Sequence, residues 1–246
     1  MSSISDLQKE FERIKKMGWI KEKRKGPSSI GYTFEVMLKK EEENFPIPDF
    51  GDIEIKTMNT KAKHNLHLFN LTPDGDYVFP IKRILDILGY PDKDNPKNKV
   101  LYRSFSGAIY NKMIYGRSGI LKVNYEKEKV QLLVYDHRGN NINLGISWSF
   151  SWLKERLNLK LRYLAIIRVT SRIIYNEGYY YYNKINFYKL KDFNTLLSLI
   201  EKGIIEVTFK IGVYKSGRRT GEIYDHGTDF SIKPENILLL YNEIKV

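Results

Sequence analysis

The sequence of 246 residues predicts a mixed α/β fold. Segments with apolar residues three or four positions apart, which is typical of helices, are interleaved with segments that alternate polar and apolar residues like strands. Hydrophobic residues make up 42% of the chain, which is enough for a sizeable core. The sequence contains no internal repeat and no low-complexity linker. We therefore expect one domain over residues 1–246 with two lobes.

Two helices are predicted at the start of the chain. Ser5 and Gln8 have the spacing of a capping box, and they begin an amphipathic segment that Gly18 ends. A second helix is expected over residues 30–44, where apolar residues recur at helical spacing. The sequence Phe-Pro-Ile-Pro at 45–48 cannot be helical, so it separates this helix from the next element.

Strands and helices then alternate to the end of the chain. Residues 51–57 have the polar–apolar alternation of a strand, and residues 66–71 are expected to form the neighbouring strand. The later predicted elements are a helix at 80–88, a hairpin of strands at 120–125 and 130–135, a helix at 148–157, strands at 163–169 and 179–183, a helix at 192–202 ended by Gly203, a strand at 204–214 and a closing helix at 234–242.

The composition excludes several classes of protein. Cysteine is absent, which excludes disulfides, thiol catalysis and zinc sites with Cys ligands. No stretch approaches the roughly 18 consecutive apolar residues of a membrane span. The N-terminus lacks the apolar stretch of a signal peptide. We therefore expect a cytoplasmic protein with no membrane partner.

The positive charge indicates a polyanionic partner. The chain has 41 Lys and Arg against 29 Asp and Glu, which gives a net charge of +12 and a pI near 9.5. A folded domain of this charge usually binds nucleic acid, although a uniformly basic, solvated surface is the simple alternative. Three stretches contain several basic residues and no acidic residue, namely residues 95–125, 156–176 and 207–221. This uneven distribution favours a basic face or cleft that binds a polyanion.

Residues 49–57, Asp-Phe-Gly-Asp-Ile-Glu-Ile-Lys-Thr, contain the strongest candidate for catalysis. Side chains two apart on a strand share a face, so Glu54 and Lys56 point to one side and the isoleucines to the other. Asp49 precedes the strand closely enough for its carboxylate to meet that of Glu54. Two close carboxylates repel each other unless a divalent cation lies between them, and such hard oxygen ligands suit Mg²⁺. This site could hydrolyse a phosphodiester, with Lys56 orienting water or stabilising charge on the phosphate.

Two plainer interpretations stay open from these residues alone. An acid and a lysine two apart on a strand are often only a solvated ion pair. Asp52 has the same parity as Glu54 and could bind the metal in place of Asp49, although an Asp beside Gly is more often a turn residue.

The chain resembles the MvaI/BcnI family of type II restriction endonucleases and, more distantly, the MutH mismatch-repair nickase. The matching segments occur in order from about Trp19 to Ile232, with little similarity between Pro73 and Asn124. They are Lys23–Gly26, Ile30-Gly31, Thr33–Glu35, Asp49 with Ile53–Thr57, Trp148–Phe150, Lys160-Leu161, Tyr163–Ile167, Ile211-Gly212, Tyr214, Ser216-Gly217, Gly221, Asp225–Thr228 and Phe230.

This resemblance implies a PD-(D/E)xK nuclease core, a central mixed sheet flanked by helices, with two lobes around a DNA cleft. The catalytic lobe would comprise mainly residues 19–75 and 120–170, and the recognition elements mainly residues 80–118 and 171–246. The implied reaction is Mg²⁺-dependent, sequence-specific cleavage of double-stranded DNA, with Mn²⁺ as a substitute. The implied catalytic set is Asp49, Glu54, Lys56 and Glu35, with Asp49, Glu54 and Ile55 as metal ligands.

Members of this branch act as monomers on nearly symmetric sites and cut one strand at a time. The resemblance also implies a cognate DNA methyltransferase in the same restriction–modification system. Two alternatives are a MutH-like repair nickase and a nucleic-acid-binding protein without activity. The products formed from a plasmid distinguish a repair nickase from a restriction endonuclease. A nickase leaves open circles, whereas double-strand cleavage gives linear DNA. The complete Asp, Glu and Lys set argues against the second.

Three groups of residues are candidates for DNA binding. Lys23, Arg24 and Lys25 precede the catalytic residues and could bind backbone phosphates, although a solvated basic loop is equally plausible for any one of them. A basic, glycine-containing loop could enter a groove, where an Arg can bind a guanine edge. Its candidates are Lys215, Arg218 and Arg219. The family match adds Asp225 and His226, for which an ordinary turn histidine is the alternative.

Overall fold

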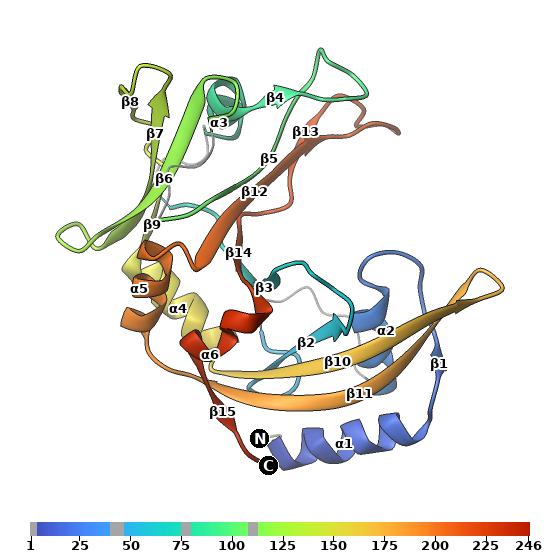
Figure 1. The fold of residues 1–246 in the computed structure, drawn as a ribbon. Helices are drawn as coiled ribbons and strands as arrows, with labels where there is room; N and C mark the ends of the chain where they lie inside the picture. Colours follow the sequence, from blue (N-terminus) through green and yellow to red (C-terminus); the bar gives the residue numbers. More distant parts are fainter. Residues whose placement is uncertain (1–3, 40–46, 75–79, 108–112) are drawn as a thin grey trace. The chain divides into compact units, whose positions relative to one another are not determined.

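Two compact units make up the chain, and each is formed by segments that are distant in sequence (Figure 1). The structure is a computed structural model that describes residues 4–39, 47–74, 80–107 and 113–246. The first unit contains the chain up to His64, Leu157–Lys191 and Tyr241–Val246, and the second contains Asn65–Arg156 and Asp192–Leu240. Residues 120–156, expected in the catalytic lobe, thus lie in the second unit, and residues 171–191 lie in the first.

The first unit is built on one sheet with the strand order β1–β11–β10–β2. The strands β10 and β11 form a long antiparallel hairpin, β2 runs parallel to β10, and β15 pairs with the other edge of β11. Parallel pairing of β2 with β10 leaves β2 at an edge of the sheet. The strands are β1 (Ile20–Lys21), β2 (Ile53–Asn59), β10 (Tyr163–Ile174), β11 (Glu177–Leu190) and β15 (Tyr241–Ile244).

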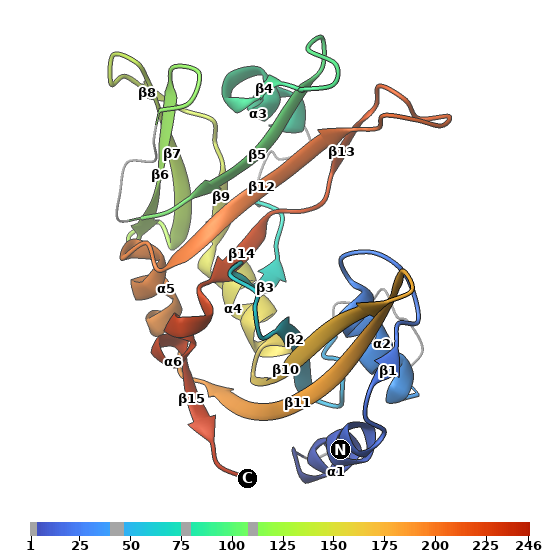
Figure 2. The ribbon, with the colours of Figure 1, turned by 45° about the vertical axis from the view of Figure 1, so that its right-hand side comes forward.

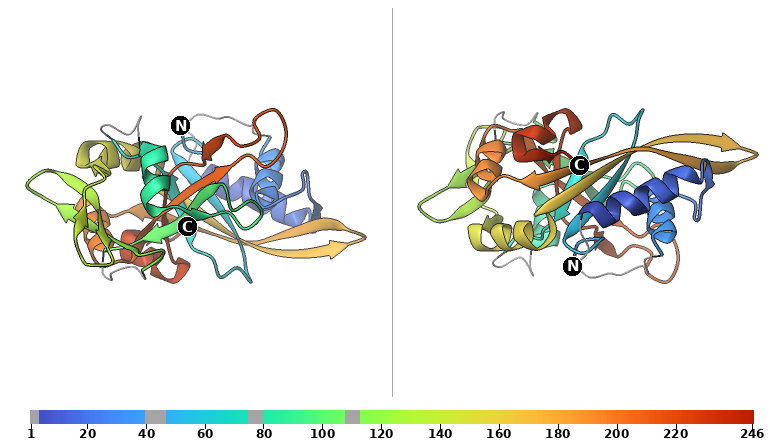
Figure 3. Two further views of the ribbon diagram at one scale, coloured as in Figure 1. Left: turned by 90° about the horizontal axis from the view of Figure 1, so that it is seen from above. Right: turned by 90° about the horizontal axis from the view of Figure 1, so that it is seen from below.

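Two helices, α1 (Ile4–Lys16) and α2 (Ser29–Met37), supply the apolar cover of this sheet. Leu7, Phe11 and Ile14 recur at helical spacing on α1 and are buried. They join Phe34 of α2 in one core cluster with odd-numbered residues of the strands, namely Ile53, Ile55, Ala165, Ile167 and Val169. The outer part of the β10–β11 hairpin extends beyond both helices (Figure 3). One face of the sheet is therefore core, and the even-numbered residues of β2 and β10 lie on the other.

A β-bulge in β11 keeps this division of faces along the whole hairpin. Arg168 pairs with Lys184, whereas the next residue, Val169, pairs with Tyr182, so Asn183 is the extra residue. Its side-chain amide donates to Thr170 Oγ1 over 2.9 Å. Tyr182 and Phe187 lie on opposite sides of the bulge, yet both belong to the core cluster.

The second unit contains two antiparallel sheets, and β5 and β12 run side by side in the larger one (Figure 2). Trp148, Phe209 and Phe230 are fully buried between its elements, and the Trp148 indole donates to Leu71 O over 2.9 Å. The larger sheet has β3 (Leu66–Asn70), β4 (Tyr90–Pro91), β5 (Lys99–Phe105), β12 (Ile205–Val213), β13 (Ile223–Asp225) and β14 (Asp229–Ile232). The smaller has β6 (Arg117–Asn124), β7 (Lys129–Asp136), β8 (Asn141–Ile142) and β9 (Ser147–Ser149).

The remaining helices are short. They are α3 (Pro80–Leu88), α4 (Phe150–Lys160), α5 (Phe193–Glu201), the 3₁₀ turn η1 (Pro234–Asn236) and α6 (Ile237–Leu240). Asp192 caps α5 by accepting from the Thr195 N–H, and Gly203 follows its end with φ +68°, as predicted. The longest described helix has 13 residues, and no helix in the described ranges is long and apolar enough to cross a bilayer.

The predicted mixed fold is confirmed, but the two helices at the start of the chain differ from the prediction. The helix α1 begins at Ile4, so Ser5 lies inside it and is not the N-cap. The second helix ends at Met37, because Lys39 adopts φ +60° and its N–H bonds Val36 O. The predicted extension to residues 40–44, and the Phe-Pro of 45–46, lie outside the described residues.

One predicted strand pairing and one predicted helix were wrong. Residues 66–71 do not form a neighbour of the 51–57 strand: β3 pairs with β14 in the second unit, and β2 pairs with β10. The predicted C-terminal helix is only one 3₁₀ turn and the short α6, followed by β15. Its last residues instead extend the first sheet, where the Tyr241–Ile244 backbone pairs with β11.

Candidate active site

A tight turn places Asp49 beside the exposed edge of β2. Phe50 and Ile53 exchange backbone hydrogen bonds of 3.0 and 2.9 Å, and Gly51 permits the reversal with φ +62°. Asp49 Oδ2 then accepts a 2.8 Å hydrogen bond from the Ile55 N–H. Because the N–H and C=O of one strand residue point to the same edge, the Ile55 carbonyl lies on the edge that Asp49 occupies.

Glu54 and Lys56 share one face of β2, as the alternation of side chains predicts. Glu54 Oε1 accepts a 2.6 Å hydrogen bond from Lys56 Nζ. The Glu54 side chain is only 2% exposed, whereas that of Lys56 is 18% exposed. The carboxylate is thus withdrawn from solvent, and the ammonium group that holds it still reaches solvent.

A second lysine contacts the same carboxylate oxygen. Lys160, the last residue of α4, has its Nζ atom 3.5 Å from Glu54 Oε1 and a side chain that is 24% exposed. In the sequence, Lys160 stands out only as one basic residue of the acid-free stretch at residues 156–176 and as part of a segment that resembles the family. Nothing in the spacing of 106 residues between them indicates that the two groups meet.

Burial raises the pKa of the Glu54 carboxyl above its usual value of 4.5. Lys56 and Lys160 act in the opposite direction, while the nearby Asp49 carboxylate raises the pKa further. Repulsion between Asp49 and Glu54, expected from the sequence, is therefore present. The site contains an acid that is costly to ionise in the absence of additional positive charge.

The residues present fit a divalent cation. Glu54 Oε2 is buried and has no hydrogen-bond partner among the described residues, which is costly for a carboxylate oxygen unless a cation completes it. Asp49 adds a second carboxylate, and the edge-facing Ile55 carbonyl adds a third hard oxygen. Asp52 is exposed in the 50–53 turn. This donor set of oxygens favours Mg²⁺ or Mn²⁺ over softer metals.

Glu35 does not join Asp49 and Glu54 in a three-carboxylate group. No cluster of three or more acidic or histidine side chains able to hold a metal occurs within the described residues. Glu35 lies on α2, where a Cβ built on Gly31 would be 3.8 Å from its Oε1 and 3.5 Å from Thr57 Oγ1. It is thus close to the core-facing side of β2, and its part in catalysis stays a prediction.

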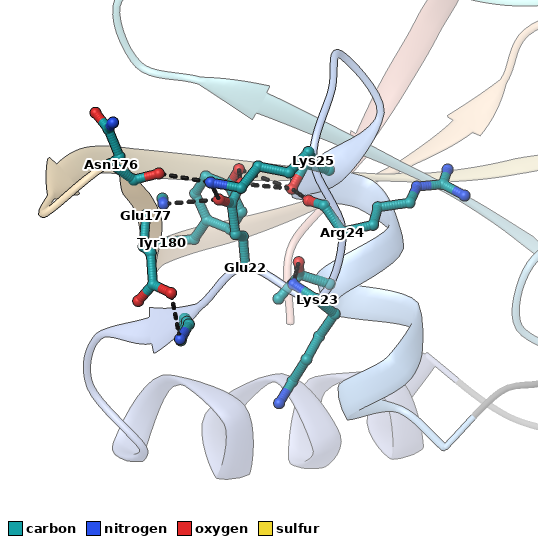
Figure 4. Close-up of polar contacts among 11 residues, drawn as sticks. Glu22, Lys23, Arg24, Lys25, Asn176, Glu177 and Tyr180 are labelled. Carbon is teal, nitrogen blue, oxygen red and sulfur yellow. Dashed lines mark hydrogen bonds and ion pairs between the residues drawn. The ribbon is translucent and has the colours of Figure 1, made fainter.

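The three basic residues before α2 point in different directions (Figure 4). Lys25 Nζ donates to Asn176 O over 2.5 Å and lies 3.2 Å from Glu22 Oε1. Arg24 stacks 4.1 Å from the Tyr32 ring centroid and donates to Ser28 Oγ over 2.7 Å. The Lys23 side chain is exposed. Lys25 is therefore already tied to the β10–β11 turn, whereas the other two present their charges elsewhere.

In the second unit, the predicted basic loop is confirmed between β12 and β13, with Gly217 at φ +84°. Lys215 forms ion pairs with Asp92 and Asp94. Arg219 stacks 4.4 Å over the Tyr214 ring and bonds Glu222 over 2.6 Å. Arg218 has no hydrogen bond or ion pair to any residue that the structure describes, so its guanidinium is available to a ligand.

Asp225 and His226 follow at the end of β13. Asp225 Oδ1 accepts from the Gly227 N–H over 2.9 Å and fixes the turn. The exposed His226 ring contacts the Tyr224 ring edge-on, with centroids 4.6 Å apart. His226 is thus a ring that a neighbouring aromatic orients towards solvent.

Comparison with known proteins identifies the family of the chain. The model of the MvaI/BcnI restriction endonuclease family matches residues 8–241. The solved complex of restriction endonuclease MvaI with its cognate DNA substrate is 35% identical over 97% of this chain and 96% of that chain, with a TM-score of 0.88. MvaI in the absence of DNA is 34% identical over 99% of each chain, with a TM-score of 0.63. No curated protein matches the chain. The chain therefore belongs to the MvaI/BcnI restriction endonuclease family and is a type II site-specific deoxyribonuclease.

Proposed function

We propose that this endonuclease hydrolyses phosphodiester bonds of double-stranded DNA at Asp49, Glu54 and Lys56 with Mg²⁺ as its cofactor. The observation that carries the proposal is the buried Glu54 carboxylate. Two lysines hold one of its oxygens, and the other oxygen has no hydrogen-bond partner among the residues that the structure describes. Asp49, Glu54 Oε2 and the Ile55 carbonyl would hold the cation. Its positive charge would polarise the scissile phosphoryl group.

The protein side chains have distinct tasks in this reaction. Asp49 is fixed by the Ile55 N–H, so its carboxylate is positioned before any ligand binds. Lys56 is held by Glu54 but still reaches solvent, where its ammonium group can orient the attacking water or stabilise charge on the phosphate. Glu54 thus serves both as a ligand and as the group that positions Lys56. Glu35 would support the site from α2.

We propose that basic side chains of each unit contact DNA. Lys23 and Arg24 are proposed to contact phosphates, which fix the register of the duplex. Arg218 and His226 are proposed to contact base edges, with Lys215, Arg219 and Asp225 holding the loop and turn that present them. We expect the enzyme to act as a monomer in the cytoplasm, beside a cognate DNA methyltransferase.

Digestion of a sequenced, unmethylated plasmid tests the function. With Mg²⁺ or Mn²⁺ we expect discrete linear fragments, and none with a chelator. Lys56→Ala should abolish cutting while DNA binding is largely kept, because the substitution removes a group of the reaction and not the basic surface. Open circles as the only product would indicate a repair nickase. Absence of any cleavage with either metal would overturn the proposal.

A further inference from the structure

The face of the first sheet that carries Glu54 continues along the β10–β11 hairpin. Glu54 pairs with Leu164, and every second residue of β10 after Leu164 lies on the same face. The bulge at Asn183 keeps the paired residues of β11 on this face too. From the catalytic end towards the hairpin turn, these side chains are Arg168, Thr170 and Arg172 on β10, and Lys184, Tyr181 and Tyr179 on β11.

Aromatic rings hold one of these basic side chains, that of Arg172, in place. The Arg172 guanidinium lies 4.0 Å over the Trp19 ring and 5.9 Å from the Tyr179 ring centroid. Trp19 in turn contacts Tyr181, with centroids 5.8 Å apart. Arg172 is nevertheless exposed. A planar guanidinium that lies over an aromatic ring and is still exposed to solvent is well suited to bind a phosphate.

The charge of this face is not neutralised internally. Arg168, Arg172 and Lys184, here called the basic strip, form no ion pair with any residue in the described ranges. The acid nearest the turn, Glu177, is already bound by Lys21 over 2.6 Å. The basic strip therefore presents an uncompensated positive charge on the same face as the catalytic carboxylate.

We propose that the basic strip binds the sugar–phosphate backbone of duplex DNA outside the recognised sequence. The inference rests on the proposed function, since it places the scissile phosphate at Glu54. Arg172 lies eight residues beyond Leu164, or at most ~26 Å along a strand at ~3.3 Å per residue. That length corresponds to roughly eight base pairs at ~3.4 Å each. The strip thus extends the DNA contact well past a short recognition sequence.

The first test measures salt dependence without cleavage. Binding of a long duplex is titrated in chelator by fluorescence anisotropy, for the wild type, Arg172→Ala/Lys184→Ala, and Lys9→Ala. Lys9 is an exposed lysine, with a side chain 79% exposed, on α1, which covers the opposite face. Each lost phosphate contact should reduce the magnitude of the negative slope of log K against log salt by ~0.9. The double variant should therefore lose about 1.8 and Lys9→Ala nothing. Equal slopes for the three proteins would overturn the proposal.

The second test varies the flank. Duplexes carrying the cleaved sequence end either about 4 or about 16 base pairs from the cut, on each side in turn, which brackets the eight expected. The wild type should bind the long flank more tightly on one side only, and Arg172→Ala/Lys184→Ala should remove that preference while short duplexes are bound and cut as before. If wild-type binding did not depend on flank length, the proposal that the basic strip binds DNA would be overturned. If the protein cut none of these duplexes, the proposed nuclease function would be overturned. The salt slopes would still show whether the basic strip binds DNA.

Discussion

The Nζ atom of Lys160 lies 3.5 Å from Glu54 Oε1, the same oxygen that Lys56 Nζ holds at 2.6 Å. Two ammonium groups from different elements therefore converge on one buried carboxylate. Removing one partner of a buried charge leaves the other uncompensated, which costs more than loss of an exposed pair. Lys160 accordingly acts through Glu54, as a positioning residue for the proposed metal ligand.

Substitution of Lys160 should weaken cleavage and metal binding together. For Lys160→Met we expect a loss of about 10–100-fold, as is usual when a group that orients a metal ligand is removed. The loss should be smaller than for Lys56→Met, and higher Mg²⁺ should partly restore the rate. Lys154→Met is the matched control, since Lys154 is exposed on the same helix. Equal rates for the Lys160 and Lys154 variants would exclude the positioning role.

Asp49 and Asp52 can be separated directly. Asp49 is anchored to the Ile55 N–H, whereas Asp52 is exposed in the turn. Asp49→Ala should therefore abolish cleavage and reduce Mn²⁺ binding measured by calorimetry. Asp52→Ala should retain both, apart from a small effect on the turn. The opposite result would make Asp52 the ligand.

Cleavage should depend on the ionisation of Glu54. Burial raises the pKa of this carboxyl above 4.5, and a cation binds only the ionised form. At subsaturating Mg²⁺, the single-turnover rate should fall as the pH drops through this raised pKa. Lys160→Met should shift the acid limb to higher pH, because Lys160 lowers the pKa of Glu54. An acid limb that is unaffected by both Mg²⁺ and this substitution would contradict the assignment.

The same shift has a defined sign for stability. The pKa of Glu54 is higher in the folded than in the unfolded chain. At pH values between these two pKa values, the metal-free folded protein therefore binds more protons than the unfolded chain. Its contribution to the free energy of unfolding is thus present at low pH and is lost as the pH rises from about 4.5 through the raised value. Thermal unfolding in chelator should show this fall, and saturating Mg²⁺ should reverse it.

The local pattern predicted the strand that carries the candidate catalytic residues, because side-chain alternation places Glu54 and Lys56 on one face wherever the strand lies. It could not predict that β2 pairs with β10, since partner strands are chosen by packing over a long sequence separation. The error over residues 66–71 arose from assuming that successive strands pair. Lys160 was missed for the same reason, because only the tertiary fold brings the end of α4 to Glu54.

The two arginines of the β12–β13 loop should behave differently. Arg219 is held by Tyr214 and Glu222, whereas Arg218 has no partner among the described residues. If Arg218 binds a guanine edge, Arg218→Ala should lower discrimination against a substituted site by about 1–3 kcal/mol. The loop and thermal stability should be unchanged. Arg218→Lys should not restore discrimination, since an ammonium lacks the bidentate fork. Unaltered relative cleavage of cognate and substituted sites would exclude this contact.

Asn183 should be essential as an extra residue but not as a side chain. Deleting it would shift one half of β11 by one position, so that either Lys184 or Tyr182 would turn to the wrong face of the sheet. The deletion variant should therefore lose cooperative unfolding in urea. Asn183→Ala keeps the bulge and removes only the hydrogen bond to Thr170, which should cost about 0.5–1.5 kcal/mol. A stable deletion variant that still cleaves DNA would show that the register of the hairpin does not maintain the catalytic face.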